Sequence, residues 1–154
     1  MRHKSIQRLV RAILLFAAAA TARSQDWPRW RGPEGDGISR ETQWSADGFH
    51  STPKILWKAS VGQGFSSISV AGKYLYTMGN ENDKDTVWCF DVETGKKIWT
   101  HSYPCGLGSH PGPRATPTVD GGLVYTLSRE GHLFALEAGS GKVRWSRHLV
   151  EDFS

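Results

Sequence analysis

The chain has 154 residues, the length of one ordinary domain, and carries 19 Lys+Arg against 15 Asp+Glu, for a formal net charge of +4. Taken alone, that excess suggests nucleic acid or a membrane surface as a partner. A hydrophobic content of 38% argues against a disordered or membrane-spanning chain. Two cysteines exclude a multi-disulfide scaffold and a four-thiolate zinc site, whereas 17 Gly and 7 Trp favour β structure with many turns.

The N-terminal segment changes the meaning of the charge. Four basic residues precede an apolar run, and a small-residue triplet, Ala20-Thr21-Ala22, follows it. This order of features predicts a secretory signal peptide over residues 1–22, too short in its apolar part for the ~20 residues of a membrane span. Cleavage after Ala22 leaves basic and acidic residues equal in number, so a nucleic-acid partner is no longer expected. No lipobox cysteine follows, and we expect a secreted or periplasmic protein.

Residues 23–54 form a Gly- and Trp-rich N-terminal arm with no regular period. Gly32-Pro33 and Gly35-Asp36-Gly37 are turn signals. A polar, Gly-rich segment buries too little surface to be stable alone. We therefore expect an extended arm that docks on a larger body through its indoles, which belong to Trp27, Trp30 and Trp44.

An internal repeat dominates the remainder of the chain. The segments 66–79 and 115–128 match at an offset of 49 positions, and 89–99 matches 135–145 at an offset of 46. The offsets place three extra residues of the first copy in the Asn80–Asp85 loop. Shared Gly, Tyr, Thr, Lys and Trp residues in the same order make a repeated structural unit the natural interpretation.

Each copy reads as four short strands, which in the second copy span about 116–119, 123–128, 132–137 and 143–148. Val119-Asp120-Gly121-Gly122 predicts a tight hairpin between the first two. Four strands in ~45 residues is the blade of a β-propeller. We predict an all-β propeller of four-stranded antiparallel blades, with blades at about 62–103 and 112–150 in a repeat region 55–154. Ile55–Lys58 is interpreted as the last strand of a preceding or closing blade.

The segment Cys89–Trp99 resembles the tryptophan-docking motif of PQQ-like repeat proteins, named after pyrroloquinoline quinone. Its pattern, Ala-x-Asp-x-x-Thr-Gly-x-x-x-Trp, has Cys89 here where Ala is usual. The second copy, beginning at Ala135, carries Glu and Ser where Asp and Thr are usual. Together with the opening Trp27-Pro28-Arg29-Trp30, these motifs resemble secreted bacterial members of the PQQ-like β-propeller family, within the quinoprotein alcohol dehydrogenase-like superfamily.

The motif residues are assigned structural roles. The glycines turn the chain into the last strand, the tryptophans offer a flat apolar surface to the next blade, and the acid and hydroxyl side chains bond turn amides. The positions are Asp91, Thr94, Gly95, Trp99, Glu137, Ser140, Gly141 and Trp145. None of these roles requires a ligand.

The resemblance also implies where chemistry would lie. Quinoprotein dehydrogenases of this superfamily bind PQQ and calcium and use a vicinal Cys-Cys pair, whereas Cys89 and Cys105 are 16 positions apart. Asn80–Asp85 offers oxygens but lacks the central Gly and terminal Glu of a calcium loop, so we expect a solvated inter-strand loop. No catalytic residue or metal ligand is assigned, the cofactor-binding residues are unknown, and PQQ and calcium follow from the resemblance alone.

Two weaker groupings involve the cysteines. His101 and His110 flank Cys105 in a Pro/Gly-rich stretch, which could form a soft copper or zinc cluster, although a surface loop is the favoured interpretation. Cys89 and Cys105 could form a disulfide in an oxidising compartment, and the sequence leaves this open.

The number of predicted blades bears on the expected function. Propellers close with ~4–8 blades, and the run Glu151–Ser154 reads as the start of a third. We expect a truncated part of a longer propeller or, alternatively, several copies that assemble into a ring. The favoured function is a platform that binds or scaffolds a protein or polymer, as outer-membrane assembly propellers do. The alternatives are a PQQ-dependent alcohol dehydrogenase whose site lies in other blades, and a polysaccharide-associated module that uses exposed Trp.

Overall fold

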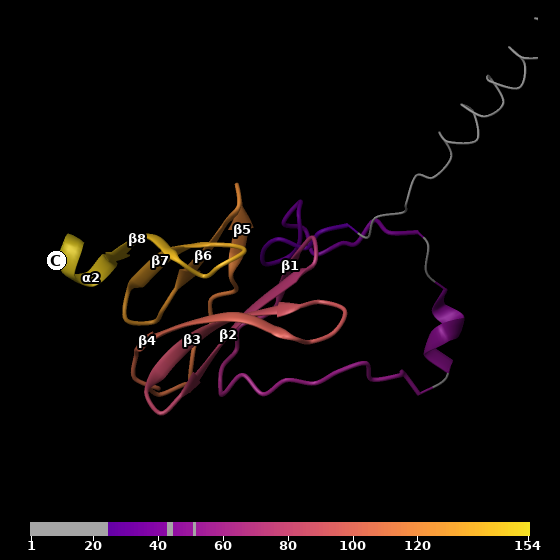
Figure 1. Cartoon of the computed structure of the whole chain (residues 1–154), viewed down its shortest axis with the longest axis horizontal. Coiled ribbons are helices and arrows are strands. Elements are labelled where there is room, and N and C mark those ends of the chain that lie inside the picture. The colour runs from indigo at the N-terminus through magenta and orange to yellow at the C-terminus, as the bar shows by residue number, and fades with distance from the viewer. Residues whose placement is uncertain (1–24, 43–44, 51) are drawn as a thin grey trace, which may run out of the picture.

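The computed structural model describes residues 25–42, 45–50 and 52–154, so the predicted signal peptide lies outside the described residues. Two four-stranded antiparallel sheets follow one another along the chain, in the strand orders β1-β2-β3-β4 and β5-β6-β7-β8. Figure 1 shows them as adjacent blades. The predicted class, all-β with four-stranded antiparallel blades, is confirmed. The strands are β1 Ser69–Ala71, β2 Tyr74–Glu81, β3 Lys84–Asp91, β4 Lys97–Pro104, β5 Thr118–Asp120, β6 Leu123–Leu127, β7 His132–Glu137 and β8 Val143–His148.

The hairpin between β5 and β6 forms as the sequence predicts. Asp120 pairs with Leu123, and the two residues between them, Gly121 and Gly122, have φ of 54° and 80°. Positive φ at both turn positions is what a tight two-residue hairpin requires, and glycine adopts it without strain. The last two strands of this blade have the bounds that the sequence indicates.

The hairpin between β2 and β3 corrects one expectation. Asn80 and Asp85 face each other as paired residues inside the strands, each only 1% exposed, and the turn is confined to Asn82 and Asp83. The extra residues of the first copy therefore lengthen two strands and do not form a solvated loop. Burial is tolerated because Asn80 Nδ2 donates to Asp85 Oδ1 (2.7 Å) and to the carbonyl of Cys105 (2.8 Å).

The N-terminal arm docks on the first strands of both blades. Trp27 exchanges two backbone hydrogen bonds with Val70, each 2.9 Å, and the amide of Val119 donates to the carbonyl of Pro28 (2.7 Å). Trp30, by contrast, is 64% exposed, so the expectation that it docks is wrong; Trp44 lies outside the described residues. The arm continues into a short 3-10 helix, η1 Ala46–His50.

Two short segments differ from their predicted form. Residues 55–58 belong to no strand, and Ile55 and Leu56 are 64% and 73% exposed, because no neighbouring strand supplies backbone partners within the described residues. The run read as the start of a third blade lies in a short helix, α2 Leu149–Phe153. Neither helix in the described residues is long and apolar enough to cross a membrane.

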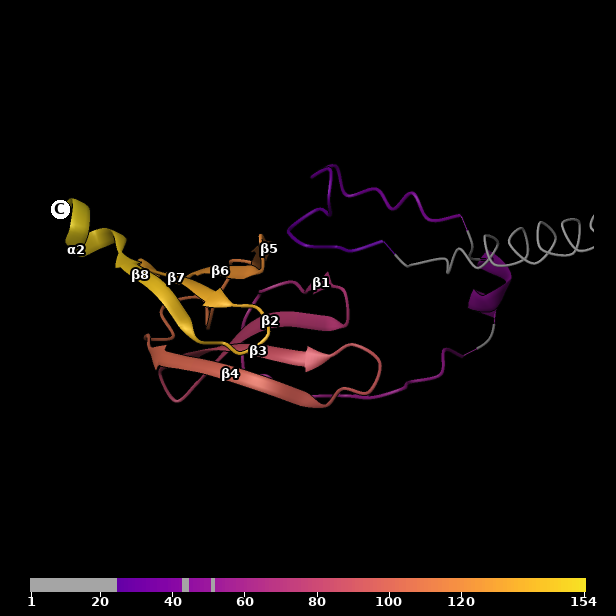
Figure 2. The same ribbon diagram turned by 45° about the horizontal axis from the view of Figure 1, so that its top comes forward.

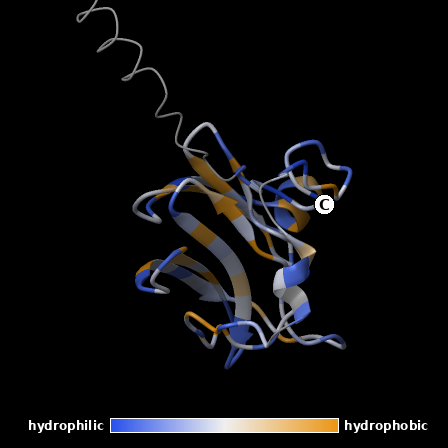
Figure 3. Ribbon diagram, turned by 90° about the vertical axis from the view of Figure 1, so that its right-hand side faces the viewer, coloured by the Kyte–Doolittle hydropathy of each residue, from blue (hydrophilic) through white to orange (hydrophobic). Residues whose placement is uncertain are grey.

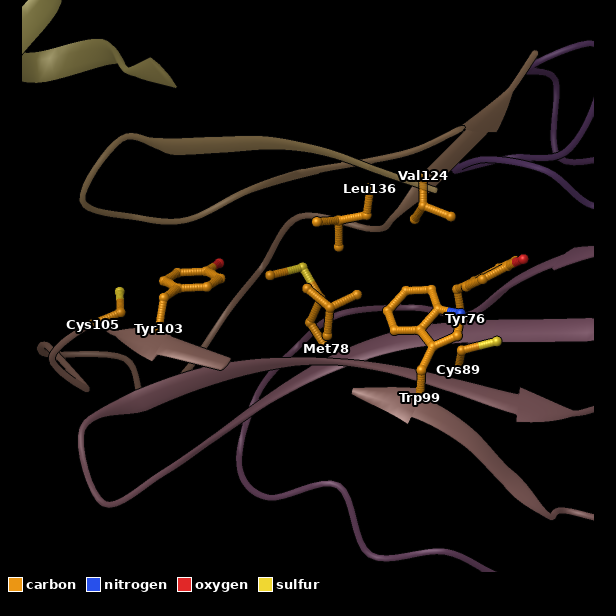
Figure 4. Close-up of a cluster of buried hydrophobic side chains, with 9 residues drawn as sticks. Tyr76, Met78, Cys89, Trp99, Tyr103, Cys105, Val124 and Leu136 are labelled. Atoms are coloured by element: carbon orange, nitrogen blue, oxygen red, sulfur yellow. The ribbon is translucent and has the colours of Figure 1, made fainter. Parts of the chain in front are cut away.

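The core lies between the two blades. Figure 2 shows the sheet β5–β8 stacked over the sheet β1–β4, and Figure 4 shows Val124 and Leu136 pointing from the second blade toward Met78, Tyr103 and Trp99 of the first. These side chains are at most 8% exposed. In Figure 3 the strands carry most of the apolar colour and the hairpin turns are largely hydrophilic. A single blade therefore buries its faces only against a neighbour.

Candidate functional site

Two tryptophans dock on glycine turns in the same way. The ring of Trp57 lies over Gly95, and the ring of Trp99 lies over Gly141; a Cβ at either glycine would come within 2.5 Å of ring carbon. Both glycines also have positive φ, 69° and 71°. The indole Nε1 of Trp57 donates to the carbonyl of Val92 (3.0 Å), and that of Trp99 donates to the carbonyl of Ala138 (2.9 Å). The missing side chain of glycine is what allows this close approach.

The acid and hydroxyl positions of the motif stabilise the turns. Asp91 Oδ1 accepts hydrogen bonds from the amide of Thr94 (2.9 Å) and from its hydroxyl (2.7 Å). These bonds hold the pKa of Asp91 below its usual value. In the second blade the Ser140 hydroxyl donates to Glu137 (2.9 Å). The side chains thus bond locally, in the positions that the sequence assigned to them.

The third tryptophan of the series, Trp145, contacts no glycine turn among the residues that the structure describes. The ring of Trp145 lies 6.0 Å from that of Tyr125 in a tilted contact, as the ring of Trp99 lies 5.9 Å from that of Tyr76, so the two tryptophans occupy the same place within their blades. Yet Trp145 is 42% exposed and its indole forms no hydrogen bond within the described residues, whereas Trp99 is 8% exposed. Blade 2 presents an open docking surface, which we define by Trp145 and the neighbouring exposed Val143.

The two cysteines are free thiols at opposite ends of the core. Figure 4 places Cys89 beside Tyr76 and Trp99, and Cys105 beside Tyr103. Burial raises the pKa of Cys89 to about 12, so this thiol stays protonated. The structure does not join the two sulfurs in the disulfide that the sequence left open.

Cys105 lies close to two residues of the second blade, Glu130 and His132. Ligand atoms of Cys105, Glu130 and His132 all lie within 4.8 Å of one another. Cys105 directly follows β4, Glu130 lies in the link between β6 and β7, and His132 begins β7. The three side chains therefore form a blade-junction cluster, with Cys105 buried and the other two half-buried.

Backbone hydrogen bonds fix the loop that carries Cys105. Its amide donates to the carbonyl of Asp83 (2.9 Å), and the next amide, of Gly106, donates to Glu130 Oε1 (3.0 Å). Arg129 Nη1 donates to the Gly106 carbonyl (3.1 Å) and to the same Glu130 oxygen (3.2 Å). The loop is thus held by a hairpin of each blade.

The sequence proposed other partners for Cys105. His101 lies in β4, with its ring 4.6 Å from that of Phe134, and burial lowers its pKa. His110 is exposed and lines an open basic depression with Arg114 and Arg129. Neither histidine belongs to the cluster. The two histidines are neighbours of Cys105 in sequence, whereas the cluster joins the loop after one blade to a hairpin of the next.

Comparison with known proteins identifies relatives of the repeat region. Residues 84–154 match the PQQ-type family model described as "Outer membrane protein assembly factor BamB". The protein of that name from Escherichia coli (strain K12) is 36% identical over 69 residues, which cover 40% of this chain and 18% of that protein. Residues 84–154 therefore resemble PQQ-like repeats. The chain spans less than a fifth of the length of this curated relative.

Solved structures support the propeller fold of the PQQ-like repeats. A europium-containing methanol dehydrogenase superposes with a TM-score of 0.68 at 16% identity, covering 82% of this chain and 23% of that one. A quinohemoprotein alcohol dehydrogenase from Comamonas testosteroni gives 0.66 at 23% identity, covering 88% and 21%. At such identities the likeness concerns the fold and not the activity.

Proposed function

We propose that the two blades belong to a PQQ-like propeller of the bacterial envelope that serves as a binding scaffold for other proteins. The similarity of residues 84–154 to the outer membrane protein assembly factor carries this proposal, and the open docking surface of blade 2 is where we expect the next blade to bind. A tryptophan ring packs on a glycine turn twice inside the chain, at Gly95 and at Gly141. Trp145 occupies the equivalent position in blade 2, and its ring is exposed to a partner. A large exposed aromatic with an unused indole donor suits a protein contact.

The partner of Trp145 needs a glycine turn of the same type. Gly95 of a second copy is the obvious choice, but the chain's own Trp57 already fills that turn. Copies therefore cannot add head to tail while Trp57 stays in place. We infer that the direct partner of Trp145 is a further PQQ-like blade with a free turn, and that the scaffold function belongs to the larger assembly.

Support for a scaffold role comes from the motif residues and from the relative. The polar motif side chains bond their own turns. The segment that is 36% identical to the outer membrane protein assembly factor covers 69 residues. A periplasmic or secreted location is part of the proposal and agrees with the signal peptide that the sequence predicts.

The proposal can be tested by site-specific photo-crosslinking in Escherichia coli. A photoreactive residue at position 145 should give discrete adducts with a blade-bearing protein, identified by mass spectrometry. The same residue at position 93, on the exposed turn of blade 1, is the matched control and should give none. Absence of adducts, together with alcohol-dependent dye reduction after addition of pyrroloquinoline quinone and calcium, would favour the dehydrogenase alternative instead.

A further inference from the structure

We propose that Cys105, Glu130 and His132 bind a divalent transition-metal ion of the zinc class at the junction of the two blades. Thiolate sulfur, imidazole nitrogen and carboxylate oxygen are the three ligand types that zinc takes in proteins. Their ligand atoms already lie within 4.8 Å of one another. Tetrahedral zinc, with bonds of about 2.0–2.3 Å, needs ligand separations of about 3.5 Å, which small side-chain rotations would supply.

The free atoms of the cluster suit a cation. Glu130 Oε1 accepts from Gly106 and Arg129, while Oε2 accepts no hydrogen bond within the described residues. His132 Nδ1 is 3.1 Å from the hydroxyl of Ser128, a contact of the kind that orients a metal-bound imidazole through its second nitrogen. One oxygen and one ring nitrogen therefore remain for an ion, with a water as fourth ligand.

A second observation points to the same place. Within the described residues, Asn80 Oδ1, Asp85 Oδ2 and the hydroxyl of Tyr103 are buried without a hydrogen-bond partner. Asp85 is 1% exposed, and its carboxylate lies close to the Cys105 thiol. A buried carboxylate oxygen without a partner is costly unless a cation lies near. The unpartnered carboxylate oxygen of Asp85 thus favours a cation beside the thiol.

The chemistry of binding follows from the state of the thiol. Zinc binds cysteine as the thiolate, so the Cys105 thiol must lose its proton when an ion binds. An incoming ion forms the sulfur–metal bond as the S–H bond breaks, and the proton leaves to solvent. The bound ion would connect the end of β4 to the start of β7.

The inference does not depend on the scaffold role and is tested with Zn²⁺ and Co²⁺ added to the reduced, purified chain. We expect one Zn²⁺ per chain by competition with a chromogenic chelator. Co²⁺ should give the visible bands of a tetrahedral site and a near-ultraviolet thiolate-to-cobalt band. Less than one ion per chain at saturation, or a cobalt spectrum without the thiolate band, would overturn the proposal.

Matched variants locate the ion. Cys105→Ser and His132→Gln should each weaken Zn²⁺ binding by about 100-fold or more, and Glu130→Gln by about 10-fold or more. Cys89→Ala and His110→Gln, which change the other thiol and an exposed histidine, should leave affinity unchanged. Circular dichroism confirms that each variant is folded. Equal affinity in Cys105→Ser and Cys89→Ala would refute the site.

Discussion

Blade 1 and blade 2 carry the same motif but differ in what covers it. Blade 1 is flanked on one side by Trp57, in the segment that follows the arm, and on the other by blade 2, and its Trp99 is 8% exposed. In blade 2 the equivalent Trp145 keeps its tilted ring contact with Tyr125 but is 42% exposed. The difference shows that the motif positions the tryptophan ring within its own blade, and that the ring becomes buried only when a neighbouring blade packs against it.

The largest effect is expected at Trp99. Trp99→Ala should destabilise the chain by about 3–5 kcal/mol, because the indole is buried between the blades and bonds the Ala138 carbonyl. Trp145→Ala, at the equivalent position of blade 2, should cost about 1 kcal/mol or less. Urea unfolding of both variants measures the difference. Equal losses would show that burial does not distinguish the two blades.

A second way to break the contact acts on the glycine. Gly141→Ala should cost about 2–3 kcal/mol, because φ is 71° and the new Cβ would lie 2.5 Å from the ring of Trp99. Gly139→Ala, two residues away and with open space at its Cβ, is the control and should change stability little. Thermal unfolding compares the two. A loss at Gly139 as large as that at Gly141 would contradict the docking argument.

Removing Trp57 should make blade 1 resemble blade 2. Trp57→Ala is expected to cost about 1–2 kcal/mol and to uncover the Gly95 turn. Trp145 of another copy could then dock there, so the mass measured by light scattering should rise with concentration. The double variant Trp57→Ala/Trp145→Ala should not associate. Association that persists in the double variant would assign it to another surface.

The smallest effect concerns pH. Burial lowers the pKa of His101 in the folded chain, so the unfolded chain binds a proton first as the pH falls below the usual value of about 6.5. Stability should therefore fall from pH 7 toward pH 5. His101→Phe should flatten that slope relative to the unchanged chain, as measured by urea midpoints across the range. An unchanged slope would locate the titration elsewhere.

Much of this fold follows from local sequence signals. Three features were predictable from the sequence: the Asp120-Gly121-Gly122 turn, the offsets of the repeat, and the docking positions of Trp99 and Gly141. Turns and repeats depend on residues that are close together in the sequence. Asn80 and Asp85 were misjudged because their burial depends on a hydrogen bond to the Cys105 carbonyl, 25 positions away from Asn80.

The blade-junction cluster could not be found in the same way. Cys105 belongs to one blade, whereas Glu130 and His132 belong to the next, and only the packing of the two blades brings them together. The sequence instead suggested His101 and His110, which are close to Cys105 in the sequence but do not belong to the cluster. The cluster could have been found by asking which residues of the β6–β7 hairpin face the loop after β4 when two consecutive blades pack together.

The attachment of the arm also bears on the order in which the chain folds. Each blade is built from hairpins, whose partners are close in sequence and meet quickly. The contact from Pro28 to Val119 instead closes a very long loop and needs β5 to exist first. During synthesis the arm therefore emerges early but docks late, after both blades have formed, and its docking then holds the two blades together.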